Sequence, residues 1–383
     1  MNQVHKGRFA LAAAALAGSA GLAQADTSSE LQELRARVEA LEAENQQVTG
    51  APGDFRLGNT TIDIYGYVKA DFFYDFDSNL GDFAVVTNIG EPANATDGNF
   101  GATVRQSRLG VRTSTQSDFG EIGSQLEFDL FNGGANGTSE LRLRHANVTL
   151  GDNWLIGQYW TNFMPLNEYP TSVEFNGPVG ITFARVPQIR YTNTWGQTTF
   201  SASLEESFNE TASTDPVVTA ALSHSTDRFT ARIAGLAGTV DVGGQEFDQT
   251  GVTLSGSVRP WDGGLFQATY VDGEALGPLL IGFGDAVVGG QANDVEGYTL
   301  EFRQDIGRKW NVGIAYGRED YDLPTSTGTL AFTELETVHV NAFYNATDNL
   351  TFSAEYLFGE RNDAASGSTF DGDRVQFAVQ LNF

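Results

Sequence analysis

The sequence has no cysteine, and it is short of lysine and proline, which further limits the classes of protein to which it can belong. Without cysteine there is no disulfide scaffold and no thiolate metal site. Lysine is nearly missing, because only Lys6, Lys69 and Lys309 occur and the rest of the 22 basic residues are arginines. No run of about 18 apolar residues follows residue 25, so no membrane-spanning helix is expected there. Proline is scarce at 10 residues and glycine abundant at 44, which is typical of many strands joined by turns.

Charge is lopsided, with 49 acidic residues against 22 basic ones and a net charge of −27. Such acidity repels nucleic acid, so no nucleic-acid partner is expected. Signals for catalysis are missing as well. His5, His145, His224 and His339 show no metal-ligand spacing, and there is no nucleophile–histidine–acid set or phosphate loop. We therefore expect neither an enzyme nor a bound metal or cofactor.

Residues 1–25 have the pattern of a cleaved secretory signal peptide. Lys6 and Arg8 precede an apolar stretch, and Ala23-Gln24-Ala25 forms an A-x-A cleavage site. A membrane-anchored amino terminus is the alternative, but the stretch is too short to span a membrane. We expect the mature chain to cross the inner membrane.

Residues 26–49 follow a helical period that the rest of the chain does not share. Spacings of three and four residues predict a coiled coil, which would lie in the periplasm. Its expected core positions are Leu31, Leu34, Val38, Leu41, Asn45 and Val48. A single amphipathic helix packed on its own domain is the alternative. Residues 50–60, which begin Gly50-Ala51-Pro52-Gly53, are expected to form a linker that detaches the coiled coil.

From residue 61 to residue 383 the period is two, the period of a β-strand. In the last segment, RVQFAVQLNF, every second residue is apolar and the final residue is Phe383. One apolar face per strand suits a soluble sandwich, where that face lies inside, or an outer-membrane barrel, where it faces lipid. Aromatic residues near the strand ends match the interfacial girdles of such a barrel.

The links between strands distinguish these two architectures. Long links are expected at about 76–102, 132–139, 161–186, 207–216, 238–250, 272–294, 318–335 and 359–373. Short links are centred on residues 117–118, 151–153, 195–197, 226–227, 261–263, 307–308 and 347–349. Alternating long and short links are typical of bacterial barrels, with tight periplasmic turns and longer extracellular loops. They predict an all-β transmembrane barrel of about 16 antiparallel strands, preceded by the short α-helical coiled coil.

Alternation also assigns side chains to the lumen, where arginine avoids a cost of about 2–4 kcal/mol at mid-bilayer. The basic residues expected to line the pore and select solutes are Lys69, Arg108, Arg112, Arg142, Arg144, Arg190, Arg232 and Arg303. Near Arg142 the inward direction is ambiguous, because Val148 and Leu150 share the arginines' face. A ladder that steers anions and a set of ion pairs that braces the wall both fit this pattern.

The third long link, at about residues 162–184, is the expected constriction loop. Its aromatic residues suit packing inside the barrel, and Glu168 and Glu174 are expected to lie opposite the arginines. A plain extracellular loop is the alternative. The terminal Phe383 is expected on a strand that pairs with the first one, because a barrel has no free edge. This residue also resembles the β-signal read by the barrel assembly machinery.

Several motifs together resemble one family. The segment "SELQELRARVEALEAENQQV" precedes "GYVKADFFYD", "VRQSRLGVRTST", "LRLRHANVTLG" and "LIGQYWTNF", and the chain ends with "FAVQLNF". Over essentially the whole mature chain, these are similar to the DcaP-like trimeric porins of Gram-negative outer membranes. The resemblance implies a 16-stranded homotrimer with a periplasmic coiled coil and pore-lining roles for Lys69, Arg108 and Arg112. It also implies passive diffusion of small hydrophilic solutes, biased to anions such as dicarboxylates.

The expected location is therefore the outer membrane of a Gram-negative cell. Expected partners are further copies of the chain, outer-membrane lipid and lipopolysaccharide, the barrel assembly machinery and small anionic solutes. A structural anchor that tethers the outer membrane through the coiled coil is the alternative function. An outer-membrane hydrolase is disfavoured because no nucleophile constellation occurs.

Overall fold

The computed structural model describes residues 54–118, 120–134, 137–208, 213, 215–326 and 328–383. The predicted signal peptide, the predicted coiled coil and the start of the predicted linker lie outside these residues. Within them, no helix is long and apolar enough to cross a membrane. The elements are β1 (Asp54–Leu57), β2 (Thr60–Asp75), η1 (Val86–Asn88), β3 (Asn99–Thr103), β4 (Arg108–Ser117), β5 (Gly120–Gly133), β6 (Ser139–Leu150), β7 (Trp154–Trp160), η2 (Leu166–Glu168), β8 (Arg185–Trp195), β9 (Thr198–Glu205), β10 (Val217–Ser225), β11 (Phe229–Val242), β12 (Gln245–Val258), β13 (Gly264–Glu274), η3 (Gly277–Leu279), β14 (Val287–Val288), β15 (Gln291–Ala292), β16 (Asp294–Ile306), β17 (Trp310–Thr325), β18 (Phe332–Asn345), β19 (Leu350–Asp363) and β20 (Thr369–Asn382).

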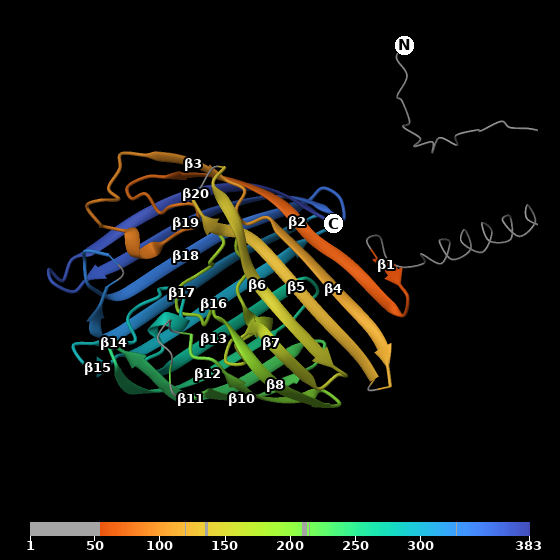
Figure 1. Ribbon diagram of the computed structural model, residues 1–383. Helices are drawn as coiled ribbons and strands as arrows, with labels where there is room; N and C mark the ends of the chain where they lie inside the picture. Colours follow the sequence, from red (N-terminus) through yellow and green to blue (C-terminus); the bar gives the residue numbers. More distant parts are fainter. Residues whose placement is uncertain (1–53, 119, 135–136, 209–212, 214, 327) are drawn as a thin grey trace, which may run out of the picture. The chain divides into compact units, whose positions relative to one another are not determined.

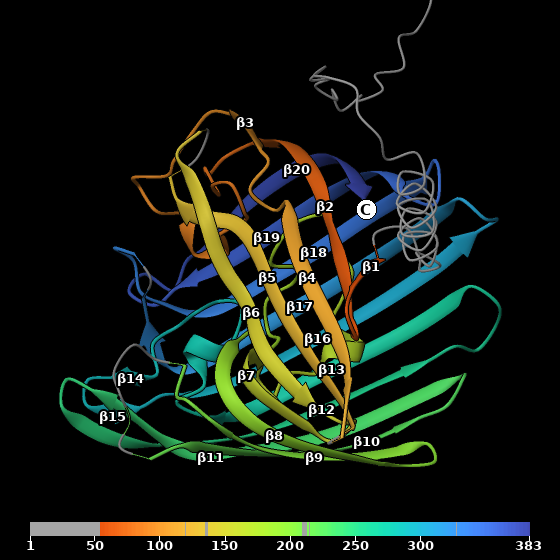
Figure 2. The same ribbon diagram turned by 45° about the vertical axis from the view of Figure 1, so that its right-hand side comes forward.

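One antiparallel sheet closes on itself to form a barrel (Figure 1, Figure 2). The closing strand is β20, which pairs with β19 on one side and with β2 on the other. β3 and β4 pair with successive parts of β2 and share one position in the wall, while β1 forms a hairpin with the start of β2. Setting β1 and β3 aside from the 18 strands leaves a closed wall of 16. The predicted barrel and its strand number are confirmed.

The alternation of links is present, but several bounds differ from the prediction. All seven short links join neighbouring strands at the positions expected from the sequence. Three predicted long links are much shorter, because their strands continue: the connections are 243–244, 326–331 and 364–368. Apolar alternation marks only the part of a strand that faces lipid, whereas backbone pairing extends beyond it. The predicted linker is also shorter, since Asp54–Leu57 forms β1.

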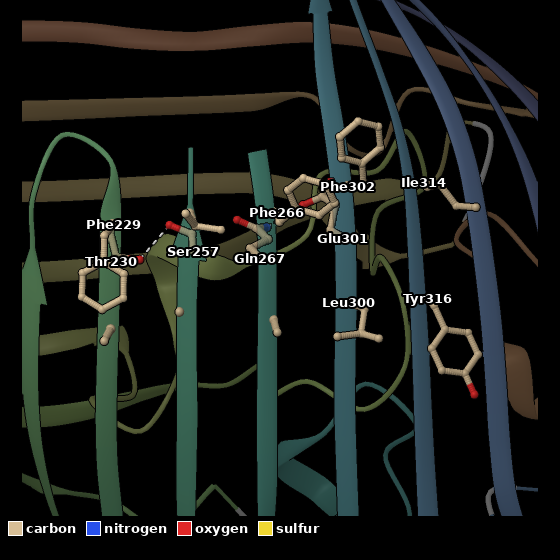
Figure 3. Close-up of a pocket in the computed structure, with 14 residues that line it drawn as sticks. Phe229, Thr230, Ser257, Phe266, Gln267, Leu300, Glu301, Phe302, Ile314 and Tyr316 are labelled. Carbon is tan, nitrogen blue, oxygen red and sulfur yellow. Dashed lines mark hydrogen bonds between the residues drawn. The ribbon is translucent and has the colours of Figure 1, made fainter. Parts of the chain in front are cut away.

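The two faces of the wall have opposite character. On β20, Phe377 and Leu381 are exposed on the outer face, whereas Gln376 and Ala378 point inward and are buried. On the outer side, residues of β11, β12, β13, β16 and β17 line an apolar groove of about 610 Å³ (Figure 3), where phenylalanines such as Phe266 stand beside small residues. An apolar outer surface with polar residues inside is the pattern of a barrel in a lipid bilayer.

The seam of the barrel uses the last residue of the chain. The Phe383 amide donates to the Gly66 carbonyl (3.0 Å), and the Gly66 amide donates to the Phe383 carbonyl (3.1 Å). The Phe383 side chain remains half-exposed on the outer surface. The sequence prediction that the last strand pairs with the first is therefore confirmed, while recognition of Phe383 as an assembly signal stays a prediction.

Gly66 is also a position where a side chain would push β4 away from β2. A Cβ atom at Gly66 would lie 2.2 Å from the Arg108 carbonyl oxygen. We expect Gly66→Ala to lower the free energy of unfolding by about 1–3 kcal/mol, because the backbone of β4 has to move. Urea unfolding in detergent micelles measures this. Gly235→Ala is the matched control, because the nearest atom to its Cβ is 3.9 Å away; an equal loss in both variants would contradict the steric explanation.

The hydrophobic core of the described residues includes side chains from three long loops, at 76–98, 161–184 and 275–293. Leu80, Ile181 and Leu280 are fully or almost fully buried in one cluster. The second and third loops are also joined through their backbones, since the Phe183 amide donates to Leu279 and the Ile281 amide to Ile181. Apolar side chains in these loops therefore hold them against the inner wall and against each other.

Candidate functional site

The loop between β7 and β8 crosses the inside of the barrel. Its amides reach inward-facing side chains on strands far from β7 and β8 in the sheet. The Thr171 amide donates to Glu301 of β16 (3.0 Å), and the Val179 amide donates to the hydroxyl of Thr337 on β18 (3.1 Å). The Gly180 amide donates to Glu319 of β17 (3.1 Å). A segment held on both sides of the barrel divides the lumen; its role as a constriction stays a prediction.

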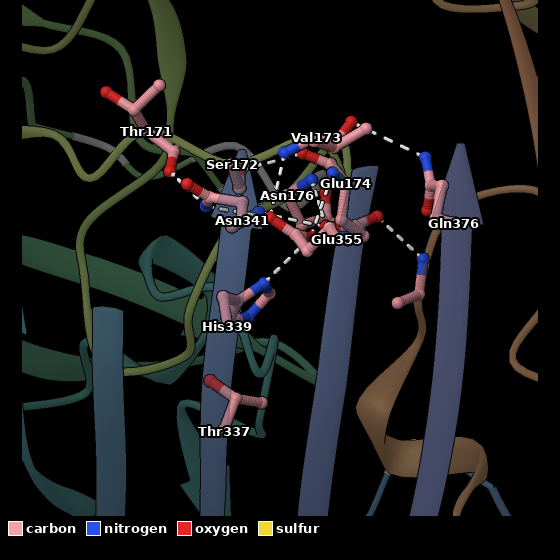
Figure 4. Close-up of polar contacts among 12 residues, drawn as sticks. Thr171, Ser172, Val173, Glu174, Asn176, Thr337, His339, Asn341, Glu355 and Gln376 are labelled. Atoms are coloured by element: carbon pink, nitrogen blue, oxygen red, sulfur yellow. Dashed lines mark hydrogen bonds and ion pairs between the residues drawn. The ribbon is translucent and has the colours of Figure 1, made fainter. Parts of the chain in front are cut away.

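Glu355 on β19 is the main anchor of the middle of this loop (Figure 4). Its carboxylate accepts the amides of Val173 (2.9 Å) and Glu174 (3.1 Å). Asn341 donates to the same carboxylate at 3.0 Å, and His339 Nδ1 lies 3.1 Å from it. One buried carboxylate thus fixes two consecutive amides of the loop.

The expectation that Glu168 and Glu174 present charge across the lumen is wrong. Glu168 is buried and accepts hydrogen bonds from the Thr230 and Ser255 hydroxyls on β11 and β12 (2.6 and 2.9 Å). Glu174 is also buried and accepts amides of Ala84 and of its own loop. Burial raises the pKa of Glu174, although the Ala84 amide opposes the shift. Carboxylates placed in an apolar loop need these donors, so they organise the loop instead of charging the pore.

Four of the predicted basic residues hold the crossing loop. All face inward, and each donates to a backbone carbonyl at the end of β7 or in the loop itself. Lys69 donates to Val173 (2.7 Å), Arg303 to Thr171 (3.1 Å), Arg190 to Trp160 (2.5 Å) and Arg232 to Asn162. These contacts assign a positioning role to side chains that were expected to select solutes, and any selective role for them stays a prediction.

Arg142 and Arg144 brace the wall through two acidic residues of β5. Arg142 makes a two-pronged ion pair with Asp129 (2.9 and 2.7 Å). Arg144 bridges Glu127 (2.7 Å) and Asp129 (2.9 Å) and is almost fully buried. The register of β5 on β6 shifts here, because Glu127 pairs with His145 while the next residue pairs with Leu143. This bulge resolves the ambiguity of the alternation, since it turns both arginines inward while Val148 and Leu150 face outward.

Arg108 and Arg112 on β4 are the predicted basic residues with the loosest pairing. Arg112 lies 3.7 Å from Asp63 and keeps 54% of its side chain exposed. Arg108 lies 3.6 Å from Glu127 and is 24% exposed. Each guanidinium stacks on a tyrosine of β2, Arg112 over Tyr65 at 3.8 Å and Arg108 over Tyr67 at 5.2 Å. Because β2 and β4 place all four residues on the inward face, two positive charges face the lumen, each with one carboxylate at 3.6 or 3.7 Å.

Arg185 is a candidate residue that sequence reasoning missed. It begins β8 directly after the crossing loop and lies against Trp160 (4.9 Å) and Phe183 (5.8 Å). A cavity of about 230 Å³ opens beside it. The cavity is lined by Arg142, Leu143, Gln158, Trp160, Phe183, Ala184, Arg185, Phe208 and Phe283. The sequence does place Arg185 directly after the aromatic loop. Alternation, however, does not predict whether a side chain at the end of a strand faces the lumen or the lipid.

Several arginine nitrogens on this wall have no acceptor among the described residues. They are Arg108 Nε, Arg185 Nη1 and Arg190 Nε, and all three are buried. A guanidinium is a donor only and matches the two oxygens of a carboxylate. The ion pairs and hydrogen bonds of this wall therefore leave some guanidinium donors unused.

Comparison with known proteins gives the family. A family model described as "DcaP outer membrane protein" matches residues 25–220, more than half of the chain. The chain belongs to the DcaP outer membrane protein family. The resemblance found in the sequence motifs is thereby confirmed. A search of curated proteins found no match.

Solved structures agree with the DcaP assignment at the level of the fold. The outer membrane channel DcaP of Acinetobacter baumannii is similar with a TM-score of 0.78 and 22% identity, covering 86% of this chain and 99% of that chain. An anion-selective porin from Comamonas acidovorans has a TM-score of 0.60 and 15% identity, covering 85% and 100%. A trimer form of OmpT from Vibrio cholerae has a TM-score of 0.56 and 14% identity, covering 85% and 99%. This DcaP-family protein is thus an outer-membrane β-barrel with a porin-like channel fold.

Proposed function

We propose that the protein is a passive diffusion channel for small hydrophilic solutes, biased to small anions such as dicarboxylates, and not an enzyme. The observation that carries the proposal is the pair Arg108 and Arg112, which face the lumen with ion-pair distances of 3.6 and 3.7 Å. The unpaired nitrogen of Arg185 beside the neighbouring cavity supports it. The anion selectivity named for the Comamonas porin is a property of that protein and agrees with the proposal.

Local charge rather than net charge decides the sign of selectivity. The chain carries a net charge of −27, so a channel governed by its whole surface would favour cations. At about 0.15 M salt, the Debye length is about 8 Å, so distant acidic residues are screened while charges beside the passing ion are not. The exposed inward arginines Arg108 and Arg112 therefore act on a passing ion more strongly than acidic residues on the outside do.

The test is the reversal potential of the wild-type channel in a planar bilayer under a potassium chloride gradient. We expect a reversal potential whose sign shows that chloride is more permeant than potassium. In proteoliposomes we expect a dicarboxylate to enter faster than a neutral sugar of similar size. A reversal potential of the opposite sign would contradict the anion bias. Absence of stepwise conductance would contradict the channel itself.

We propose further that the protein is a homotrimer, with its outer face against outer-membrane lipid and lipopolysaccharide and with Phe383 read by the barrel assembly machinery. The trimer form of the Vibrio protein and the heptad pattern of residues 26–49 support the trimer. The exposed ring of Phe383 supports recognition. The alternative function, a tether through a periplasmic coiled coil, depends on residues outside the described part of the chain.

A further inference from the structure

Four aromatic side chains line the cavity of about 230 Å³ beside Arg185. Trp160 ends β7 and Phe183 lies in the crossing loop, with their ring centroids 5.1 Å apart. Phe208 follows β9, and Phe283 lies in the loop at 275–293. Rings from separate segments of the chain therefore meet at one place, which we call the aromatic cavity.

The backbone of Phe283 adopts a conformation that is unusual for a residue with a large side chain. Its φ is +53°, in the left-handed region that residues with a Cβ rarely adopt. Its amide donates to the Leu280 carbonyl (3.0 Å), and the residue stays 38% exposed. The loop thus gains little burial from this ring. The exposed ring is available to a ligand, and backbone strain of this kind is concentrated at ligand sites.

Arg185 supplies a positive charge to the cavity that the nearby wall does not neutralise. Its Nη1 atom is buried and has no partner among the described residues. The carboxylates of β5 on this wall are paired with other arginines. Asp129 accepts from Arg142 (2.7 Å) and Arg144 (2.9 Å), and Glu127 accepts from Arg144 (2.7 Å). An anion in the cavity would therefore be the acceptor that Arg185 lacks.

The size and the lining of the cavity indicate the kind of anion that fits. An apolar cavity of about 150 Å³ binds benzene, so about 230 Å³ has room for one aromatic ring with a carboxylate attached. A carboxylate matches the planar donors of a guanidinium, and aromatic rings attract one another in offset or edge-to-face arrangements. An aliphatic dicarboxylate would bring a second charge against the rings, which costs free energy without a partner. The lining therefore favours an aromatic monocarboxylate.

We propose that the aromatic cavity is a binding subsite for an aromatic monocarboxylate of about the size of benzoate. Its carboxylate pairs with Arg185, and its ring lies among the aromatic side chains of the cavity. The subsite is distinct from Arg108 and Arg112 on β4, which act on any small anion. This inference deepens the proposed function and rests on it for the passage of the ligand, while binding is measured without conduction.

Fluorine NMR of 4-fluorobenzoate with the purified protein in detergent micelles tests the binding step. We expect the protein to broaden the signal of this probe and added benzoate to sharpen it again, because both compete for one cavity. Succinate lacks the ring and benzamide lacks the charge. Each should displace the probe at least about tenfold less well than benzoate does.

Arg185→Gln and Arg308→Gln are matched variants, because each removes one positive charge and Arg308 lies exposed in a short turn. We expect Arg185→Gln to weaken the binding of 4-fluorobenzoate at least about tenfold and Arg308→Gln to leave it unchanged. Phe283→Gly is a second variant, since glycine adopts the left-handed conformation readily and lacks the ring. It should weaken binding at least about threefold. Heat-dependent mobility on gels shows that each barrel is folded.

The outcomes separate the subsite from the channel. A wild-type protein that leaves the probe signal unchanged, or from which succinate displaces the probe as well as benzoate does, would overturn the subsite alone. Equal affinity of the wild type and Arg185→Gln for the probe would do the same. If that variant does not fold, unchanged affinity in Phe283→Gly overturns the subsite instead. Absence of stepwise conductance with binding intact would overturn the proposed channel and leave the subsite.

Discussion

Replacing Arg108 and Arg112 together by serine should shift the reversal potential of the channel toward cations. At about 8 Å in water, a unit charge contributes on the order of 0.5 kcal/mol to an ion, with opposite signs for anion and cation. Two arginines thus change the difference in free energy between an anion and a cation in the pore by up to about 2 kcal/mol without screening. At about 0.15 M salt the change is less than half of that. We expect the ratio of chloride to potassium permeability to fall at least about threefold, because 1.4 kcal/mol is tenfold.

The control for this effect keeps the change in net charge but moves it away from the lumen. Arg259 and Arg308 lie exposed in short turns, so Arg259→Ser with Arg308→Ser should leave the ratio nearly unchanged. At 1 M salt the screening length is about 3 Å, and the shift in the lumen variant should shrink. Equal shifts in both double variants would show that selectivity follows net charge, and no shift in the lumen variant would show that the two arginines only support the wall.

Replacing Glu355 by glutamine should loosen the crossing loop. The carboxylate accepts the amides of Val173 and Glu174 together with a proton donor of Asn341, and a glutamine side chain offers a single acceptor oxygen. Hydrogen bonds to a charged group contribute about 1.5–3 kcal/mol each. Loss of about 3 kcal/mol raises the population of released loop by roughly a hundredfold.

Single-channel recording measures this change as larger current fluctuations and a higher mean conductance. Limited proteolysis of the purified barrel should show faster cleavage within residues 161–184 as well. Glu336→Gln is the matched control, because Glu336 lies on the outer face of β18 in an ion pair with Arg318. A Glu355→Gln channel with wild-type noise, conductance and cleavage would contradict the view that this carboxylate fixes the loop.

Alternation predicted which side chains face the lumen where strands are regular. On β2 and β4 the backbone period is unbroken, so Lys69, Arg108 and Arg112 all have the direction expected from their neighbours. On β6 the period fails at Arg144, where the shift in register inserts one extra residue. A bulge depends on how two strands pair, and neither strand records it in its own sequence.

The chemistry of Glu168 and Glu174 shows a second limit. Both lie in the loop predicted to enter the barrel, yet their carboxylates are satisfied by hydroxyls of β11 and β12 and by loop amides. The sequence does not show these donors as neighbours, because they come from distant strands or from the shape of the loop itself. Burial then reverses the expected role, since a charge without solvent has to be hydrogen-bonded where it lies.

The sequence by itself determined the barrel, because a period of two with alternating short and long links has one closed solution in a membrane, where no strand edge is left unpaired. It also determined that arginines lie inside, because lipid excludes them from the outer face. Only the tertiary structure decided which of the inward basic residues hydrogen-bond to the crossing loop. Lys69, Arg190, Arg232 and Arg303 hold the loop, while Arg108 and Arg112 remain open to the lumen. That division depends on where a loop crosses the barrel, and the contacts that place the loop join it to strands more than a hundred residues away in the chain.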